Sequence, residues 1–279
     1  MPAPSPWSHT RSAGIADDID FEIKGQELQF VEIELDPGES AVAEAGSMVW
    51  KHADIEMTTV FGDGRAGPQG GGFMDKLVGA GKRLVTGESL FTTVFTHRGH
   101  AGKARVAFAA PVPGAIVPLK LSDIGGTLIC QKDAFLCAAR GVQLGIHFQQ
   151  RIMTGLFGGE GFIMQRLDGD GWVFAQMGGA IVEGALAAGE ELHVDTGCIA
   201  AFTPSVDFDL VRVGGVKSMV FGGEGAFYAR LRGPGKIWIQ SLPFARLAGR
   251  MLAAAGSRGG QNRGEGSALG SLGDLISGN

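Results

Sequence analysis

The chain has 279 residues, with 24 Lys and Arg against 29 Asp and Glu and a formal net charge of −5. Affinity for nucleic acid comes mainly from Lys and Arg at the phosphates, so this balance argues against a nucleic-acid partner. The longest apolar stretch, 106–119, is interrupted by three prolines, which argues against a transmembrane helix.

Residues 1–19 are predicted to form a flexible leader. They contain Pro2, Pro4 and Pro6 and no apolar core region, so we do not expect a secretory signal. The three cysteines, Cys130, Cys137 and Cys198, form no CxxC pair. Such a sparse, odd set is typical of thiols in a reducing compartment, and we therefore expect a soluble cytoplasmic protein.

The region after the leader is predicted to contain three diverged copies of one unit. The pentapeptide Phe-Gly-Gly-Glu-Gly occurs at Phe157–Gly161 and again, 64 residues later, at Phe221–Gly225. The match continues without gaps in both directions, and Leu35–Ser40 aligns with Leu186–Glu191 at a second offset of 151. Such a repeat determines the architecture before any local prediction is made. The expected organisation is leader 1–19, first β unit 20–118, second β unit 119–185, third β unit 186–247 and tail 248–279.

The first unit is expected to carry an insertion of about 15 residues relative to the others, within the glycine-rich run Gly62–Gly81. Within 73–85, apolar residues recur near helical spacing and basic residues lie off that face, which predicts a short amphipathic helix. This helix either closes one end of the β structure or contacts a peripheral membrane or protein partner.

Strands are predicted throughout the second and third units. Short runs rich in β-branched and aromatic residues, with period-two patterning, lie between turn signals, as in Trp172–Phe174, Phe208–Val213 and Phe227–Arg232. The junctions Asp168–Gly171 and Arg232–Gly235 are predicted hairpin turns, because glycine adopts positive φ without a Cβ clash. The predicted fold class is therefore all-β, with internally repeated units of the β-sandwich or β-helix type and one or two short helices.

The tail is predicted to begin with a second short helix over about 243–255, where apolar residues again recur at helical spacing. Residues 256–270 are rich in glycine and serine and are expected to be flexible.

Three segments match the sequence of a catalytic, phosphate-binding or metal-binding motif. Val194–Gly197 matches half of the aspartic-protease signature, but the aligned segments supply no second Asp-Thr-Gly, so we interpret it as a turn in which Asp195 caps backbone amides. Gly62–Gly67 spells GxGxxG but leads into proline and more glycines rather than a helix. His97 and His100 lack a third ligand at metal-site spacing, so we expect no metal, no cofactor and no catalytic residue set.

Glutamates recur at two positions of the repeat. A carboxylate beside glycines can accept bonds from neighbouring backbone amides and fix a corner of the chain. The alternative is a symmetric ring of carboxylates around an axis. The candidates for structural corners are Glu88, Glu160 and Glu224 at one position, and Glu39 and Glu190 at the other.

Several phrases in fixed order resemble the altered-inheritance-of-mitochondria family, a conserved domain of unknown function. The resemblance covers about Phe21–Leu247 and implies a β fold similar to the tryptophan RNA-binding attenuation protein, repeated within the chain and assembled into closed oligomers. Mitochondrial members are associated with inner-membrane organisation, and no catalytic residue set carries over. The phrases are Leu84–Phe91, Pro113–Pro118, Ile129–Lys132, Leu156–Phe162, Asp195–Cys198, Phe202–Val206 and Trp238–Phe244.

These observations favour a non-enzymatic, soluble β-repeat protein that acts as an oligomeric scaffold or binding module. We expect a homo-oligomer in the form of a closed ring, with a trimer as one form, and an unidentified ligand or partner. The alternatives are a protein that binds a small apolar ligand between sheets or subunits, and a metal-dependent β-helix enzyme.

Overall fold

A computed structural model describes residues 16–61, 91–150, 162–212 and 227–256. The chain divides into two compact units, Met1–Arg246 and Leu247–Asn279, and every described strand lies in the first. The predicted insertion at 62–81 and the predicted helix at 73–85 lie outside the described residues.

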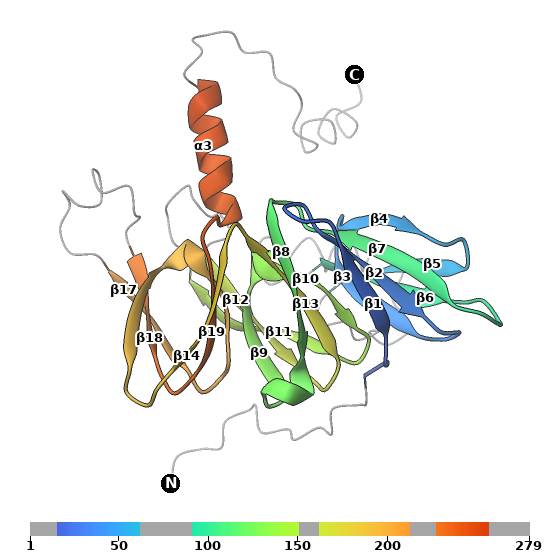
Figure 1. Ribbon diagram of the computed structural model, residues 1–279, viewed down its shortest axis with the longest axis horizontal. Helices are drawn as coiled ribbons and strands as arrows, with labels where there is room; N and C mark the ends of the chain where they lie inside the picture. The colour runs from blue at the N-terminus through green and yellow to red at the C-terminus, as the bar shows by residue number, and fades with distance from the viewer. Residues whose placement is uncertain (1–15, 62–90, 151–161, 213–226, 257–279) are drawn as a thin grey trace, which may run out of the picture. The chain divides into compact units, whose positions relative to one another are not determined.

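After β1 (Asp20–Lys24), the strands fall into three successive groups of six, which can be followed in chain order by colour in Figure 1. The first group is β2 Phe30–Leu35, β3 Ser40–Glu44, β4 Met48–Lys51, β5 Ile55–Phe61, β6 Phe91–His97 and β7 Ala104–Ala109. The second group is β8 Gly114–Lys120, β9 Thr127–Gln131, β10 Phe135–Ala139, β11 Gln143–Gln150, β12 Phe162–Asp168 and β13 Trp172–Gly178. The third group is β14 Ile181–Leu186, β15 Glu191–Asp195, β16 Ile199–Phe202, β17 Asp207–Arg212, β18 Phe227–Arg232 and β19 Gly235–Gln240.

The three groups pair their strands in the same antiparallel order. In each one, the first and third strands flank the sixth, and the second and fourth strands flank the fifth. The register agrees as well, because Leu144 lies opposite Leu167 in the second group and Phe208 opposite Leu231 in the third, a constant separation of 64 residues. The all-β class is confirmed.

Each group therefore consists of two three-stranded half-sheets. Neighbouring groups share a sheet, because β3 of the first pairs with β10 of the second, and β9 of the second pairs with β16 of the third. This produces two six-stranded sheets, β5-β6-β3-β10-β13-β8 and β11-β12-β9-β16-β19-β14. Two half-sheets remain outside them, β2-β7-β4 (extended by β1) and β15-β18-β17.

The expected unit boundaries, at 118/119 and 185/186, fall within β8 and β14. Both strands pair with the last strand of the group that follows the boundary, β8 with β13 and β14 with β19. In the described structure, the groups therefore begin a few residues earlier than the sequence boundaries.

Three hydrophobic cores accompany the three groups. The first contains Phe95 and Phe108, whose rings meet edge to face at 5.0 Å. The second contains Leu128, Leu144 and Leu167. The third contains Phe202 and Leu231. Along β18, Ala229 and Leu231 are buried between more exposed neighbours, and this alternation is the pattern that predicted the strand.

The helix α3 (Phe244–Gly256) confirms the helix predicted near 243–255. It spans the boundary between the two compact units, and its first residues, Phe244–Arg246, belong to the first. Among the described helices, none is long and apolar enough to cross a membrane.

Two backbone segments approach closely at the end of β13. Gly178 accepts a hydrogen bond from the Leu242 amide at 3.0 Å, and a Cβ built on Gly178 would overlap the Leu242 carbonyl oxygen. Only glycine therefore fits where this strand passes the segment before α3.

Replacing Gly178 by Ala should destabilise the protein by about 1–3 kcal/mol, since a backbone atom rather than a movable side chain occupies the space. Gly184→Ala is the matched control, because its Cβ would meet Ile237 Cγ1 at an ordinary 3.5 Å. Chemical unfolding of both variants measures the difference, and equal stabilities would contradict the close approach.

Candidate functional site

Glu39 and Glu190 lie at equivalent turns, between the first and second strands of their groups. Glu39 Oε2 accepts a hydrogen bond from the Asp36 amide, and Glu190 Oε2 accepts one from the Ala187 amide, both at 2.8 Å. Each carboxylate thus bonds to the backbone of its own turn. The other three corner candidates, Glu88, Glu160 and Glu224, lie outside the described residues.

Asp195 acts as a structural cap, as predicted. Its Oδ1 accepts a hydrogen bond from the Gly197 amide at 2.9 Å at the start of a short 3₁₀ turn, Thr196–Cys198. Its Oδ2 lies 3.3 Å from the Arg246 guanidinium. Both carboxylate oxygens of Asp195 therefore have partners within the fold.

The two histidines considered as metal ligands lie in different environments. His97 is buried, with Nδ1 3.0 Å from the Leu35 carbonyl oxygen, whereas His100 is exposed. Over the described ranges, no group of three or more His, Cys, Asp and Glu side chains lies close enough together to hold a metal ion.

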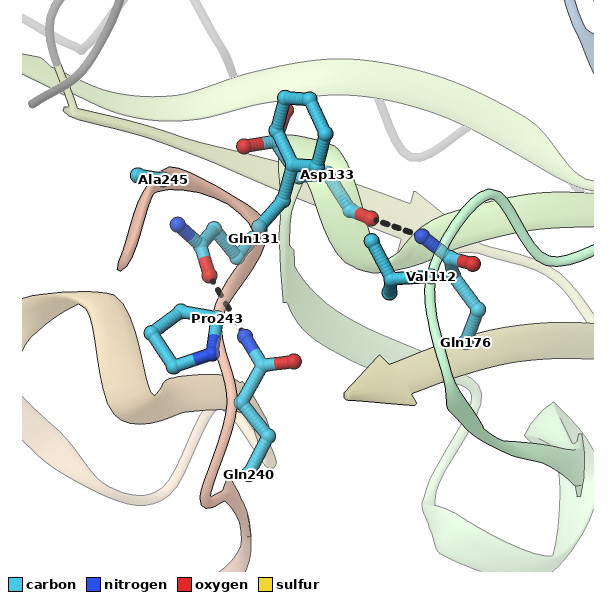
Figure 2. Close-up of a pocket in the computed structure, with 8 residues that line it drawn as sticks. Val112, Gln131, Asp133, Gln176, Gln240, Pro243 and Ala245 are labelled. Carbon is cyan, nitrogen blue, oxygen red and sulfur yellow. Dashed lines mark hydrogen bonds between the residues drawn. The ribbon is translucent and has the colours of Figure 1, made fainter. Parts of the chain in front are cut away.

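A cluster of buried glutamines lies where the second and third groups meet (Figure 2). Gln240 donates from Nε2 to Gln131 Oε1 at 3.3 Å and to the Gly197 carbonyl at 3.1 Å. Gln176, 64 residues before Gln240, donates to the Asp133 carbonyl at 2.9 Å, which repeats the bond to Gly197 one group earlier. Sequence reasoning missed these glutamines, although their 64-residue spacing was a usable signal.

The glutamines line a small pocket that includes Val112, Asp133, Pro243 and Phe244. Its cavity volume is about 10 Å³, room for roughly one water molecule. Small-molecule sites commonly enclose roughly 300–1,000 Å³. This pocket therefore gives no support to an apolar ligand, and its polar groups serve the junction between strands.

Glu44, at the end of β3, is a partly buried carboxyl with a raised pKa of about 7. Burial is the main cause, because it penalises the charged form, and the nearby negative charge of Asp133 adds to it. The positive charge of Lys132 acts in the opposite direction.

Two strands differ from their counterparts in the other groups by being exposed at the end of a sheet. β4 ends the sheet β1-β2-β7-β4, and β15 ends the sheet β15-β18-β17. Met48 and Val49 of β4 are 37% and 55% exposed, whereas the strands at the same place in the other groups, β10 and β16, are buried at every residue. Glu191, Leu192 and His193 of β15 are exposed, whereas β9 is fully buried.

Sequence reasoning did not identify these edges. The aligned positions contained a signal, because Lys51 occurs where the other copies have Ala138 and Phe202, and His193 occurs where they have Val42 and Ile129. Polar substitution in only one of three copies indicates a strand without a covering neighbour. We take β4 and β15 together as the candidate functional surface.

The recurring pairing order defines an all-β protein of antiparallel half-sheets linked in series. Within that class, the sequence profile described as Mitochondrial biogenesis AIM24 matches residues 21–242, and the chain belongs to this family. The resemblance found in the sequence is thereby confirmed.

Two relatives from one bacterium extend this result. An uncharacterized protein of Streptococcus pyogenes serotype M6 is 32% identical over 231 residues, which cover 82% of this chain and 87% of the relative. The X-ray crystal structure of a Streptococcus pyogenes protein, 28% identical, has a similar fold with a TM-score of 0.66 and covers 85% of this chain and 99% of that one. Neither description assigns an activity.

Glu190→Ala should lower the free energy of unfolding by about 1 kcal/mol, because the Ala187 amide loses its acceptor. Glu190→Gln should lose less, since the amide oxygen can still accept. Glu183→Ala, which removes an exposed carboxylate of β14, is the control and should have little effect. Denaturant titrations measure all three, and a stabilising Glu190→Gln would instead favour repulsion between carboxylates.

Glu44 should make the protein less stable as pH rises from about 4.5 to about 7. Its folded-state pKa lies above the ordinary value of 4.5, so the favourable effect of the neutral carboxyl is complete below that value and lost by about pH 7. Glu44→Gln should therefore be more stable than the parent above pH 7, by on the order of 2–3 kcal/mol, and similar near pH 4.5. Unfolding midpoints across this range provide the measurement, and parallel curves would contradict it.

Proposed function

We propose that this protein is a non-enzymatic scaffold or binding module that functions as a homo-oligomer. The observation that carries the proposal is the apolar edge strand β4, with Met48 and Val49 exposed at the end of a sheet. Proteins usually cover or charge such an edge, because its free amides and carbonyls pair with other chains. The apolar edge of β4 is therefore the expected feature of a strand that another chain covers.

The side chains that suggested chemistry support a structural role. Asp195 is held by Gly197 and Arg246, and His97 is buried against the Leu35 carbonyl. The Cys137 thiol is buried, which raises its pKa well above the ordinary value and keeps it in the weakly nucleophilic protonated form. These groups are occupied in maintaining the fold.

The cysteines also favour a reducing compartment such as the cytoplasm. Cys130 and Cys137 are free and completely buried, so they pack as small apolar side chains. Cys198 is free and only partly buried. A free, accessible thiol persists best where disulfides do not form.

A measured mass above that of one chain, in native mass spectrometry or light scattering, is the expected result for the parent protein. Val49→Asp should reduce that mass to the monomer's, because a carboxylate would have to be desolvated at the covered edge. Since Val49 is already exposed in the single chain, the variant should fold normally, as judged by circular dichroism.

Val182→Asp is the matched control. Val182 is an equally accessible valine, 59% exposed on β14. This control should retain the parent's mass. A parent protein that remains monomeric at every concentration tested would refute self-association. If both variants become monomeric, β4 is not the specific contact.

A further inference from the structure

We propose that the partner of β4 is β15 of a second copy of this chain, joined in a head-to-tail antiparallel ladder. The inference rests on the proposed homo-oligomer and specifies its contact. Both strands are described edges of the same compact unit, and they belong to different sheets of one chain.

Two of the half-sheets lack the neighbouring half-sheet that the other four have. Inside the chain, a half-sheet ending in the second strand of one group joins a half-sheet ending in the third strand of the next, through β3·β10 and β9·β16. Two half-sheets lack this junction, one ending in the third-position strand β4 and the other in the second-position strand β15. They are the complementary halves of the same junction, and their union would form a sheet of seven strands, equivalent to the two internal six-stranded sheets with β1 added at one end.

The exposure of β15 agrees with a missing neighbour. Leu192 is 36% exposed, whereas Leu128 and Ala41, at the same place in β9 and β3, are 0% exposed. On β4, Met48 and Val49 are exposed at positions where β10 has buried Phe135 and Leu136. Pairing β4 with β15 would bury these exposed side chains of both strands, as the internal junctions bury their counterparts.

The two internal junctions also predict the register. In β3·β10, Ala43 lies opposite Cys137 and Val42 opposite Ala138. In β9·β16, Cys130 lies opposite Ala201 and Ile129 opposite Phe202.

The offsets of the repeat assign each residue of the two internal ladders to an equivalent residue of β15 or β4. Both ladders then predict the same pairs of opposed residues between β15 and β4. Val194 would lie opposite Trp50, and His193 opposite Lys51. Two junctions of different sequence thus specify one alignment, which would place Leu192 opposite His52 at the next position.

Charge supports this alignment. Lys51 forms no ion pair with another described residue, and its side chain would lie diagonally between those of Glu191 and Asp195 on the same face of the sheet. Two β4 strands meeting each other would offer Lys51 no carboxylate from β4, because Met48–Lys51 contains no acidic residue. The contact is therefore between unlike edges, which builds rings when the rotation closes and linear assemblies when it does not.

Cysteine cross-linking tests both the partner and the register. Two single variants, Lys51→Cys and His193→Cys, are purified separately, mixed and mildly oxidised. Residues opposed in an antiparallel ladder lie about 4.5–5.5 Å apart at Cα, within the range a disulfide spans. The mixture should give a covalent dimer containing one chain of each variant, identified by mass.

Neither single variant should give that dimer alone, because each carries only one of the two opposed cysteines. Val49→Cys mixed with His193→Cys, two residues out of register, should cross-link at least tenfold less. All variants and the parent chain carry Cys198→Ser, because Cys198 is the described cysteine that is only partly buried, and the parent then sets the background.

A dimer formed by Lys51→Cys or by His193→Cys alone would show that like edges meet and would overturn the proposal. So would efficient cross-linking of the out-of-register pair. If the parent is oligomeric by mass but the mixture yields no mixed dimer, the proposed contact is wrong while the homo-oligomer stands. If the parent is monomeric, the homo-oligomer itself is refuted.

Discussion

The structure depends on one recurring interaction, the antiparallel ladder between the second strand of a group and the third strand of the next. Each group by itself has only two three-stranded half-sheets, and a small sheet needs further strands or a packed face to be stable. The ladders β3·β10 and β9·β16 convert four of the half-sheets into two continuous six-stranded sheets. The backbone groups of these inner strands are then paired on both sides, which allows their side chains to be buried completely.

The glutamine cluster is a consequence of the same geometry. Where β9 meets β16, the ends of neighbouring strands converge and bring polar side chains inward. Gln240 satisfies both ends of its amide, accepting from the Gly178 amide at 2.9 Å and donating to Gln131 and Gly197. Buried polar groups arranged in this way specify one alignment of the strands, because any slip would leave them unpaired.

Local features were predictable from the sequence because their causes are local. Alternation over Phe227–Arg232 predicted β18, and a helical period predicted α3 within a residue. The turns around Glu39 and Glu190 and the cap at Asp195 involve atoms only two or three residues apart. The edge strands β4 and β15 were not predictable in that way, because exposure depends on which strand lies alongside. Residues such as Gln131 and Gln240, which meet from 109 positions apart, are likewise set by topology.

The two buried cysteines have a consequence for observing how the molecule opens. Cys137 lies in the ladder β3·β10 and Cys130 in the ladder β9·β16, so each junction between groups contains one thiol. Neither thiol can react with an external reagent while its junction is closed. The labelling rate of each thiol therefore reports the local opening of one junction, separately from global unfolding. The native sequence thus contains one reactive thiol for each junction, and the cooperativity between the groups can be followed without introducing a cysteine.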